Sequence, residues 1–316
     1  MKLSNLQEGK NAFFKSHFTY NPQFKYTDPA SILSRHRQTS NRFVGVAIDI
    51  VEETLQKYGN SDILEQATGC NLLPKKDQSS WEKKSEGCYD EIAVNLTKDV
   101  ISQGSMGNVN KKPTMAINAC MARDLWLQGI GTHYFRTFNN SLQPWSNSKG
   151  CEKYGLKSAN LAEEGCIHSL LFYPALSLCQ HALLYLTDYQ ASSMSFSELF
   201  EHLEIFVKDP HTRWHYCKGT KGGLTDTSQP GGCNKDQVYL EGVLYILKHR
   251  HTIDFNLLMS LGKVSYEDID HLKNSAMLTD PRIPQFLQDR NRYTKCLEKI
   301  MMVNGLTDTL LKTLIY

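Results

Sequence analysis

A histidine at position 133 has the surroundings of a zinc ligand. It lies in the segment Ile130-Gly131-Thr132-His133-Tyr134-Phe135-Arg136. In a zinc hydrolase one helix normally supplies a His, a Glu directly after it and a second His about a turn later, so that two imidazoles hold the metal and the Glu handles protons. Here the positions five and four residues before His133 are Gln128 and Gly129. Gln is a poor zinc ligand and Gly offers no ligand or base, so only the second half of this pattern is present.

Glu164 and His168 could add ligands to such a site. They stand one helical turn apart in the segment 161–186, which is helical by composition. A metal site would then use His133 and Glu164, with His168 as a third ligand. In the alternative interpretation both histidines are structural, and Glu163 and Glu164 begin a helix whose dipole favours carboxylates there. The residues alone favour this alternative, because the first half of the ligand pattern is absent.

Other chemistry has weaker signals. The chain contains no Gly-x-Ser-x-Gly turn, and no cysteine has the context of a nucleophile, so acyl-enzyme chemistry is unsupported. Two basic clusters, Lys111-Lys112 and Lys248-His249-Arg250-His251, could attract an acidic peptide. They could equally be solvated surface charges, and the second also looks like a helix C-terminus.

The composition indicates a globular chain without a strong overall charge. The 316 residues are 41% apolar, and 35 basic against 33 acidic side chains give a net charge of +2. This balance argues against a nucleic-acid binder. Neither a signal peptide nor a run of about 18 apolar residues is present, so we expect no membrane span. The odd number of scattered cysteines favours reduced thiols and a cytosolic protein. These are Cys70, Cys88, Cys120, Cys151, Cys166, Cys179, Cys217, Cys233 and Cys296.

The elements that would position His133 are a small sheet and a central helix. Residues 91–96 alternate at period two and predict a strand, and residues 115–117 predict a second. The helix is expected over 119–138, with apolar side chains on one broad face. Its two glycines, Gly129 and Gly131, weaken the middle by roughly 1 kcal/mol each relative to Ala.

The rest of the chain is predicted to be mainly helical. An arm at 1–30, ending at Asp28-Pro29, precedes one domain at 31–316. Amphipathic spacing predicts a helix at 40–58 and another at 195–207 that Asp209-Pro210 ends. Further helices are expected at 238–249, 255–261, 266–272 and 293–314, and loops at 69–88, 139–160 and 217–236.

Several longer segments form recognisable motifs. They are 18–24, 130–136, 163–165, 207–210, 225–231, 235–240 and 261–268. In these segments the chain resembles the microtubule-associated tyrosine carboxypeptidase family of metalloproteases, and most of all its second, less characterised member type. The resemblance covers nearly everything from about Phe13 onward. It implies a zincin-like metallopeptidase domain, α+β but predominantly helical, with a small β-sheet before the central helix.

The resemblance also implies a zinc site that is incomplete here. Family members hold zinc with an H-E-x-x-x-H helix and a downstream Glu. His133 matches the second histidine and Glu164 the downstream carboxylate, whereas the first histidine and the catalytic Glu have no counterpart. The flanks are joined directly at Gly129-Ile130, which fits a deletion of about five residues. Such a loss leaves a net rotation of ~140°, so the helix must shift register or break at this junction.

The family removes the C-terminal tyrosine of α-tubulin. We therefore expect a cytoplasmic chain that meets the acidic tail of α-tubulin on microtubules, with zinc weakly bound or absent and no catalytic residue in place. The alternative is a pseudoenzyme that binds tubulin tails or other proteins without cleaving them. Family members tend to carry more N-terminal sequence, so a shortened isoform, an error in the gene model and a pseudoenzyme all fit the resemblance.

Overall fold

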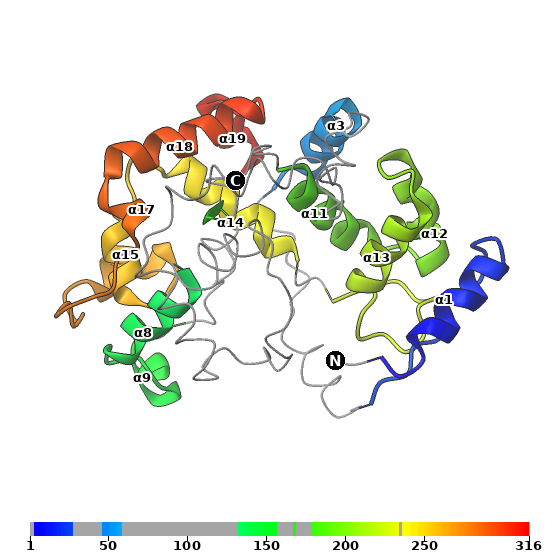
Figure 1. Ribbon diagram of the computed structural model, residues 1–316, viewed down its shortest axis with the longest axis horizontal. Coiled ribbons are helices and arrows are strands. Elements are labelled where there is room, and N and C mark those ends of the chain that lie inside the picture. The colour runs from blue at the N-terminus through cyan, green and yellow to red at the C-terminus, as the bar shows by residue number, and fades with distance from the viewer. Residues whose placement is uncertain are drawn as a thin grey trace, which may run out of the picture. The chain divides into compact units, whose positions relative to one another are not determined.

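The computed structural model describes residues 3–27, 46–58, 132–156, 167–168, 178–233 and 236–315 (Figure 1). Within them the chain is predominantly helical, which confirms that part of the predicted fold class. The predicted strands at 91–96 and 115–117 lie outside the described residues, so the small sheet and the zincin-like arrangement stay predictions. In the part of the chain that the structure describes, no helix is both long and apolar enough to cross a membrane.

Two compact units divide the chain, and each is described by itself. The first comprises Met1–Gly69, Ala175–Lys248 and Met301–Tyr316, and the second comprises Cys70–Pro174 and His249–Ile300. The predicted division into an arm at 1–30 and one domain at 31–316 stays a prediction.

The first unit is built around helix α11. Its helices are α1 (Leu6–Lys15), α3 (Ile48–Tyr58), α11 (Cys179–Ala191), α12 (Phe196–His202), the short 3-10 helix η2 (Leu203–Ile205), α13 (Pro210–Thr220), α14 (Gln237–Lys248) and α19 (Asp308–Leu314). Helix α11 packs against α14, α3, α13 and α12. Its side chains Leu183, Tyr185 and Leu186 are fully buried, so this helix forms the centre of the apolar core.

Local capping explains where two of these helices begin. The Ser195 hydroxyl accepts a hydrogen bond from the backbone N–H of Glu198, and the Glu198 carboxylate accepts one from the N–H of Ser195. This box starts α12, and with η2 it confirms most of the helix predicted at 195–207. Asp209-Pro210 was predicted to end that helix, but it begins α13. The Asp209 carboxylate accepts a bond of 2.7 Å from the N–H of Thr212, and Pro210 occupies the first helical position.

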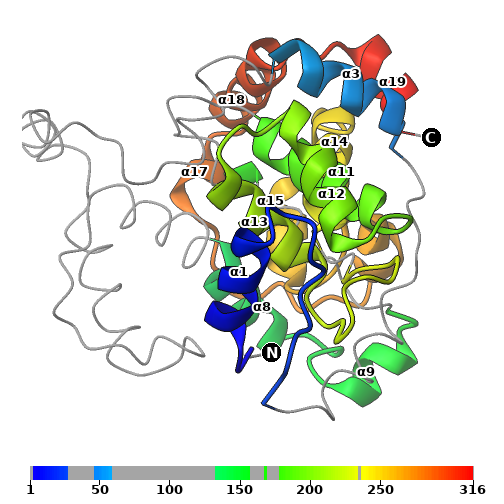
Figure 2. The same cartoon turned by 90° about the vertical axis from the view of Figure 1, so that its right-hand side faces the viewer.

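The N-terminal segment is joined to this core through aromatic side chains. Figures 1 and 2 show α1 beside α13. Phe13 on α1 is fully buried, and its ring centre lies 5.0 Å from Phe196, 4.8 Å from Phe200 and 5.3 Å from Trp214. The aromatic residues of the N-terminal segment therefore complete a core cluster.

The glycine-rich loop is paired with the N-terminal segment. The N–H of Phe24 donates to the carbonyl of Thr225 at 2.8 Å, and the Gln23 amide donates to the Asp226 carboxylate at 2.9 Å. Beneath the loop, the fully buried ammonium group of Lys221 donates to the carbonyls of Ala191, Met194 and Gln229. The prediction of a loop at 217–236 holds only after Thr220, because α13 extends to that residue.

Helix α3 begins later than predicted. Val46 forms an isolated antiparallel bridge with Ile315, and the N–H of Ala47 donates to the carbonyl of Leu314 at 2.9 Å. These contacts hold residues 46 and 47 outside the helix, so the prediction of a helix over 40–58 is wrong at these two residues, and residues 40–45 lie outside the described part. The end at Tyr58 agrees with the prediction.

The second unit contains shorter helices. They are α8 (Phe135–Ser141), α9 (Ser148–Lys153), α15 (Phe255–Leu261), the 3-10 helix η3 (Tyr266–Asp268), α16 (Ile269–Leu272), α17 (Gln285–Gln288) and α18 (Arg290–Val303), whose last residues belong to the first unit. The structure confirms α15 at 255–261 and helical structure at 266–272. In the first unit it confirms the helix predicted at 238–249 as α14, which spans Gln237–Lys248. The loop predicted at 139–160 contains α9, because the Asn147 side chain accepts a bond of 2.9 Å from the N–H of Gly150 and caps a new helix.

The helix predicted at 293–314 is two helices. Helix α18 ends at Val303, and Gly305 has a positive φ of 63°. The Thr307 hydroxyl then accepts a bond of 3.1 Å from the N–H of Leu310 and starts α19.

Candidate functional site: the surroundings of His133

His133 lies in a π-helical turn at the start of the described part of its helix. Residues 132–134 form this turn, and α8 continues from it to Ser141, three residues beyond the predicted end at residue 138. A π-turn holds more residues than an α-turn and changes the register of the side chains. It follows closely after the Gly129-Ile130 junction, where the sequence predicted a change of register. Residues 119–131 lie outside the described part, so the predicted break itself is untested.

Buried polar side chains fix α8 in place. Arg136 donates from Nε to the carbonyl of Gly262 at 2.8 Å and from a second nitrogen to the carbonyl of Val264. Asn139 donates to the carbonyl of Met259 at 2.8 Å and accepts a bond of the same length from the N–H of Arg282. These bonds join the helix that carries His133 to α15 and to the chain that follows it.

The contact between α8 and α15 is very close at Gly262. This glycine has a φ of 84°, and a Cβ atom there would lie 2.4 Å from the Cα of Asn140. The Asn140 side chain also accepts a bond of 3.1 Å from the N–H of Lys263. Only glycine allows this backbone approach, so the position of α8 depends on it.

The His133 side chain is half-buried and lies near two positively charged side chains. Burial lowers the pKa of its imidazole, and the charges of Arg136 and Lys263 lower it further. The side chain is therefore neutral near pH 7, which is the form that binds a metal. The same two cations oppose a metal ion at this place.

His168 has the environment of a structural histidine. It is fully buried, its Nδ1 lies 2.7 Å from the Thr132 hydroxyl, and its Nε2 lies 3.0 Å from the Tyr293 hydroxyl. Burial, with smaller contributions from Arg136 and His133, lowers its pKa to about 3. Because both ring nitrogens are hydrogen bonded, neither is available to a metal in this arrangement, which favours the structural interpretation of His168.

Glu163 and Glu164 lie outside the described residues, so the predicted pairing of His133 with Glu164 stays a prediction. Within the described ranges, no group of three or more His, Cys, Asp or Glu side chains could hold a metal ion. A catalytic zinc takes three protein ligands, so His133 and the other described residues do not provide a complete set by themselves.

The predicted basic clusters differ from their expected form. Lys111-Lys112 lies outside the described residues. In the second cluster, Lys248 donates to the carbonyl of Ile315 at 3.1 Å, Arg250 is buried, and the exposed His251 lies 3.9 Å from the Glu298 carboxylate. The residues from 248 to 251 do not form one exposed basic surface.

Sequence reasoning missed Thr132 and Tyr293 as neighbours of His168. They stand 36 and 125 residues from it, and no local pattern links such distant positions. Thr132 lies within the recognised segment 130–136, but nothing in that segment links it to His168 or Tyr293.

Comparisons with known proteins give close relatives. The chain is 52% identical over 327 residues to the mouse protein named "Putative tyrosine carboxypeptidase MATCAP2", in an alignment that covers 100% of the chain and 63% of the relative. It is 47% identical to the mouse "Microtubule-associated tyrosine carboxypeptidase 1" and 46% identical to the human protein of that name, with 98% of the chain and 68% of each relative covered. The chain thus spans about two thirds of the length of these relatives. No family model matches it.

Proposed function

Because the chain belongs to the family of microtubule-associated tyrosine carboxypeptidases, we propose that it recognises polypeptides that end in tyrosine and cleaves them poorly in its present form. The α-tubulin tail is the substrate that the family resemblance implies, and the relatives' names support it. The proposal includes a cytoplasmic location on or near microtubules.

The observation that carries the impaired chemistry is the sequence before His133. The first histidine and the catalytic Glu of the family pattern have no counterpart there, because the flanks are joined directly at Gly129-Ile130. In a metallocarboxypeptidase, bound zinc would polarise the scissile carbonyl and supply an activated water. This chain offers His133 and, by family resemblance, Glu164. His168 is engaged by Thr132 and Tyr293, so it does not replace the missing histidine.

The residues around His133 are still suited to hold a polypeptide end. Arg136 and Lys263 place positive charge beside the half-buried imidazole. A terminal carboxylate would be attracted to this charge, whereas a cation would be repelled. This positive charge supports the proposal of binding without efficient cleavage.

Release of tyrosine from a peptide with the sequence of a tubulin tail tests the proposal. The purified chain should release far less tyrosine, in the presence of zinc, than a version with His-Glu and the spacer restored between Gly129 and Ile130. His133→Ala in the restored version is the control and should abolish its activity. Comparable turnover by the unmodified chain would overturn the impaired chemistry.

A non-catalytic tail-binding protein is the second candidate, favoured by the same missing residues. Peptide binding separates the two. A binder should hold the tyrosine-ended peptide with equal affinity before and after restoration, whereas an enzyme that has lost part of its site should bind more tightly once His-Glu is restored.

A further inference from the structure

Helix α18 has a buried side and an exposed side. Its residues Arg290–Val303 form one continuous helix. Tyr293, Leu297 and Ile300 follow one another at four- and three-residue spacing and are buried. The exposed side carries cations and apolar side chains. We call it the α18 stripe, and it consists of Arg292, Lys295, Lys299, Met302 and Val303.

The residues of the stripe share one sector of the helix. At about 100° per residue they fall within roughly 100° of its circumference. Because they all belong to one continuous helix, this arrangement depends on helix geometry alone. Glu298 is the one acidic residue of α18, and it lies outside the sector, with its carboxylate 3.9 Å from Nε2 of His251. The stripe itself therefore combines positive charge with no carboxylate.

The cations of the stripe form no ion pair with any residue that the structure describes. Lys and Arg keep their charge at neutral pH, so this positive charge does not depend on the state of a histidine. Asp289, just before the helix, accepts a bond of 3.0 Å from the backbone N–H of Arg292. Its carboxylate therefore caps the start of α18, and the cationic side chains remain available to a partner.

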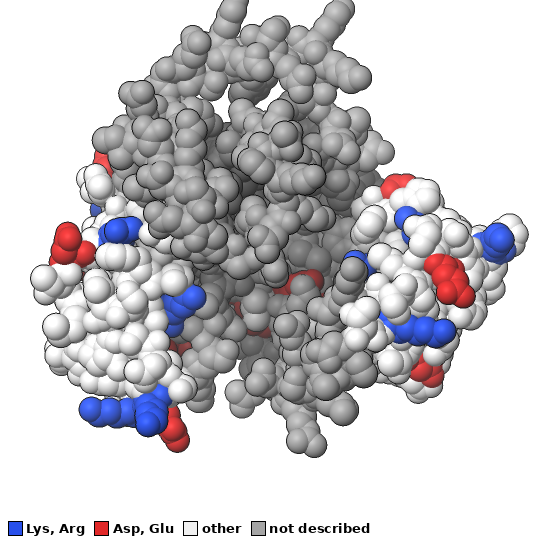
Figure 3. All heavy atoms as spheres, turned by 60° about the horizontal axis from the view of Figure 1, so that its bottom comes forward, with Lys and Arg blue, Asp and Glu red and all other residues white. Residues whose placement is uncertain are grey.

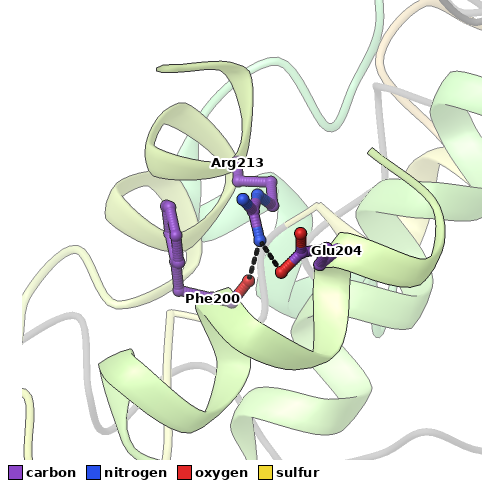
Figure 4. A network of polar contacts seen from close by, with 3 residues as sticks. All are labelled: Phe200, Glu204 and Arg213. Carbon is purple, nitrogen blue, oxygen red and sulfur yellow. Dashed lines mark hydrogen bonds and ion pairs between the residues drawn. The ribbon is translucent and has the colours of Figure 1, made fainter. Parts of the chain in front are cut away.

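Other charges of the described residues are arranged differently. Arg213 in the first unit is buried and donates from one nitrogen to the Glu204 carboxylate at 3.0 Å and to the carbonyl of Phe200 at 3.3 Å (Figure 4). Its charge is already compensated within the fold. On the face shown in Figure 3, positive and negative side chains are interspersed. The α18 stripe is therefore a local concentration of unpaired positive charge in a chain whose net charge is only +2.

Two apolar side chains continue the stripe toward the end of α18. Met302 is 72% exposed, the largest exposed fraction of any large apolar side chain in the described part of the chain, and Val303 is 48% exposed. Removal of such surface from water is favourable. The carboxylates of an acidic polypeptide or the phosphates of a nucleic acid would engage the cations only, and the stripe offers no aromatic ring on which a base could stack. A partner that fits the whole stripe is both anionic and apolar.

We propose that the α18 stripe binds the surface of a membrane that contains anionic phospholipids. Lys and Arg side chains near such a surface are attracted to the acidic headgroups. Met302 and Val303 would enter the boundary between headgroups and acyl chains, where apolar side chains leave water. Binding of this kind is peripheral and requires no membrane-spanning helix. The proposal does not depend on chemistry at His133 or on the binding of a polypeptide end.

Co-sedimentation of the purified chain with lipid vesicles provides the test. The chain should bind vesicles of equal parts phosphatidylcholine and phosphatidylserine, and it should not bind vesicles of phosphatidylcholine alone. Added salt should weaken the binding, because the cations of the stripe are exposed. Absence of binding to the phosphatidylserine vesicles at low salt would overturn the proposal.

Removal of two charges locates the binding surface. Lys295→Gln together with Lys299→Gln should weaken vesicle binding at least about tenfold, since each cation near an anionic surface contributes on the order of fivefold. Lys15→Gln together with Lys25→Gln is the matched control, because it removes the same charge from exposed lysines of the N-terminal segment. The control should bind as the unmodified chain does, and equal losses in both double variants would show that the stripe is not the binding surface. If the first double variant fails to fold, Lys299→Gln alone replaces it, with an expected loss of about fivefold.

Met302→Gln tests the apolar part of the stripe and keeps the length of the side chain. It should weaken vesicle binding severalfold without changing the salt dependence, because it removes apolar surface and no charge. Unchanged vesicle binding by this variant would contradict the proposal, as would binding of an oligoglutamate peptide that is as tight as binding of the vesicles. Since the vesicles contain no peptide, the result is independent of the carboxypeptidase proposal.

Discussion

The Thr132 hydroxyl lies 2.7 Å from Nδ1 of His168, and both groups are fully buried. Thr132 is next to His133 in the chain, so this bond holds the turn that carries the candidate metal ligand against the second unit's core. On the other side of the imidazole, Tyr293 closes the chain of hydrogen bonds at 3.0 Å. A buried network of this kind fixes a unique arrangement when all of its members are satisfied.

Loss of the hydroxyl at position 132 should therefore destabilise the chain. Thr132→Val keeps the shape but leaves one imidazole nitrogen unsatisfied, which costs about 1–3 kcal/mol of the free energy of unfolding. Urea unfolding measures the change. Thr132→Ser retains the hydroxyl and should lose clearly less, and an equal loss in both variants would show that the methyl group, not the bond, is responsible.

His168 should make stability fall in acid. Its pKa is about 3 in the folded chain, below the ordinary value of 6.5. Above pH 6.5 both states are neutral, and as the pH falls from 6.5 toward 3 only the unfolded state takes up the proton. The contribution is therefore lost by roughly 1.4 kcal/mol per pH unit across that window.

Urea unfolding at several pH values from about 7 down to about 4 tests this slope, because the histidine of the unfolded chain takes up its proton within this range. His168→Phe fits the aromatic surroundings, where Phe286 lies 4.7 Å away, and should be less stable at neutral pH but less sensitive to acid. Unchanged pH dependence in this variant would mean that other groups control acid unfolding.

Gly262 should be intolerant of substitution. Gly262→Ala places a Cβ atom 2.4 Å from the Cα of Asn140 and strains a φ of 84°, so we expect a loss of more than about 2 kcal/mol in the free energy of unfolding. Gly219→Ala in α13 is the matched control, because nothing lies within 4 Å of its added Cβ. Thermal unfolding should show no loss or a small gain for the control.

Zinc should be held weakly. After dialysis, metal analysis of the purified chain should find well below one zinc per chain, since His133 and the predicted Glu164 do not complete a three-ligand site. Restoring His-Glu should raise the zinc content. Stoichiometric zinc in the unmodified chain, lost on His133→Ala, would reveal a replacement ligand.

Elements with complete local signals could be predicted from the sequence. The helix that begins at Phe196 has its capping box at Ser195 and Glu198, and α15 has the Asp254 cap and an apolar stripe. The preceding helix ends before Asp209-Pro210, as predicted, but the start of α13 there was not predicted, because a proline both ends a preceding helix and fits the first turn of a new one. The choice depended on the packing of Trp214 against Phe13, which is invisible in a local window.

The candidate site was predictable only as far as its motif extends. His133 was found through the residues around it and the family resemblance. Its neighbours Thr132 and His168 come together across 36 residues, and Lys10 meets His215 across a still longer separation. Hydrogen bonding and charge between distant segments are decided by the tertiary fold, so helical periodicity alone does not reveal them.

The hydrogen bonds between the N-terminal segment and the glycine-rich loop can form only late in the synthesis of the chain. Gln23 and Asp226 are 203 residues apart, so the segment emerges long before its partner exists. At about 5–20 residues per second, translation of the intervening chain takes roughly 10 to 40 s. Until residues 196 to 214 have been synthesised, Phe13 lacks its contacts with Phe196, Phe200 and Trp214. During this part of synthesis the aromatic segment is therefore without the side chains that bury it in the folded chain.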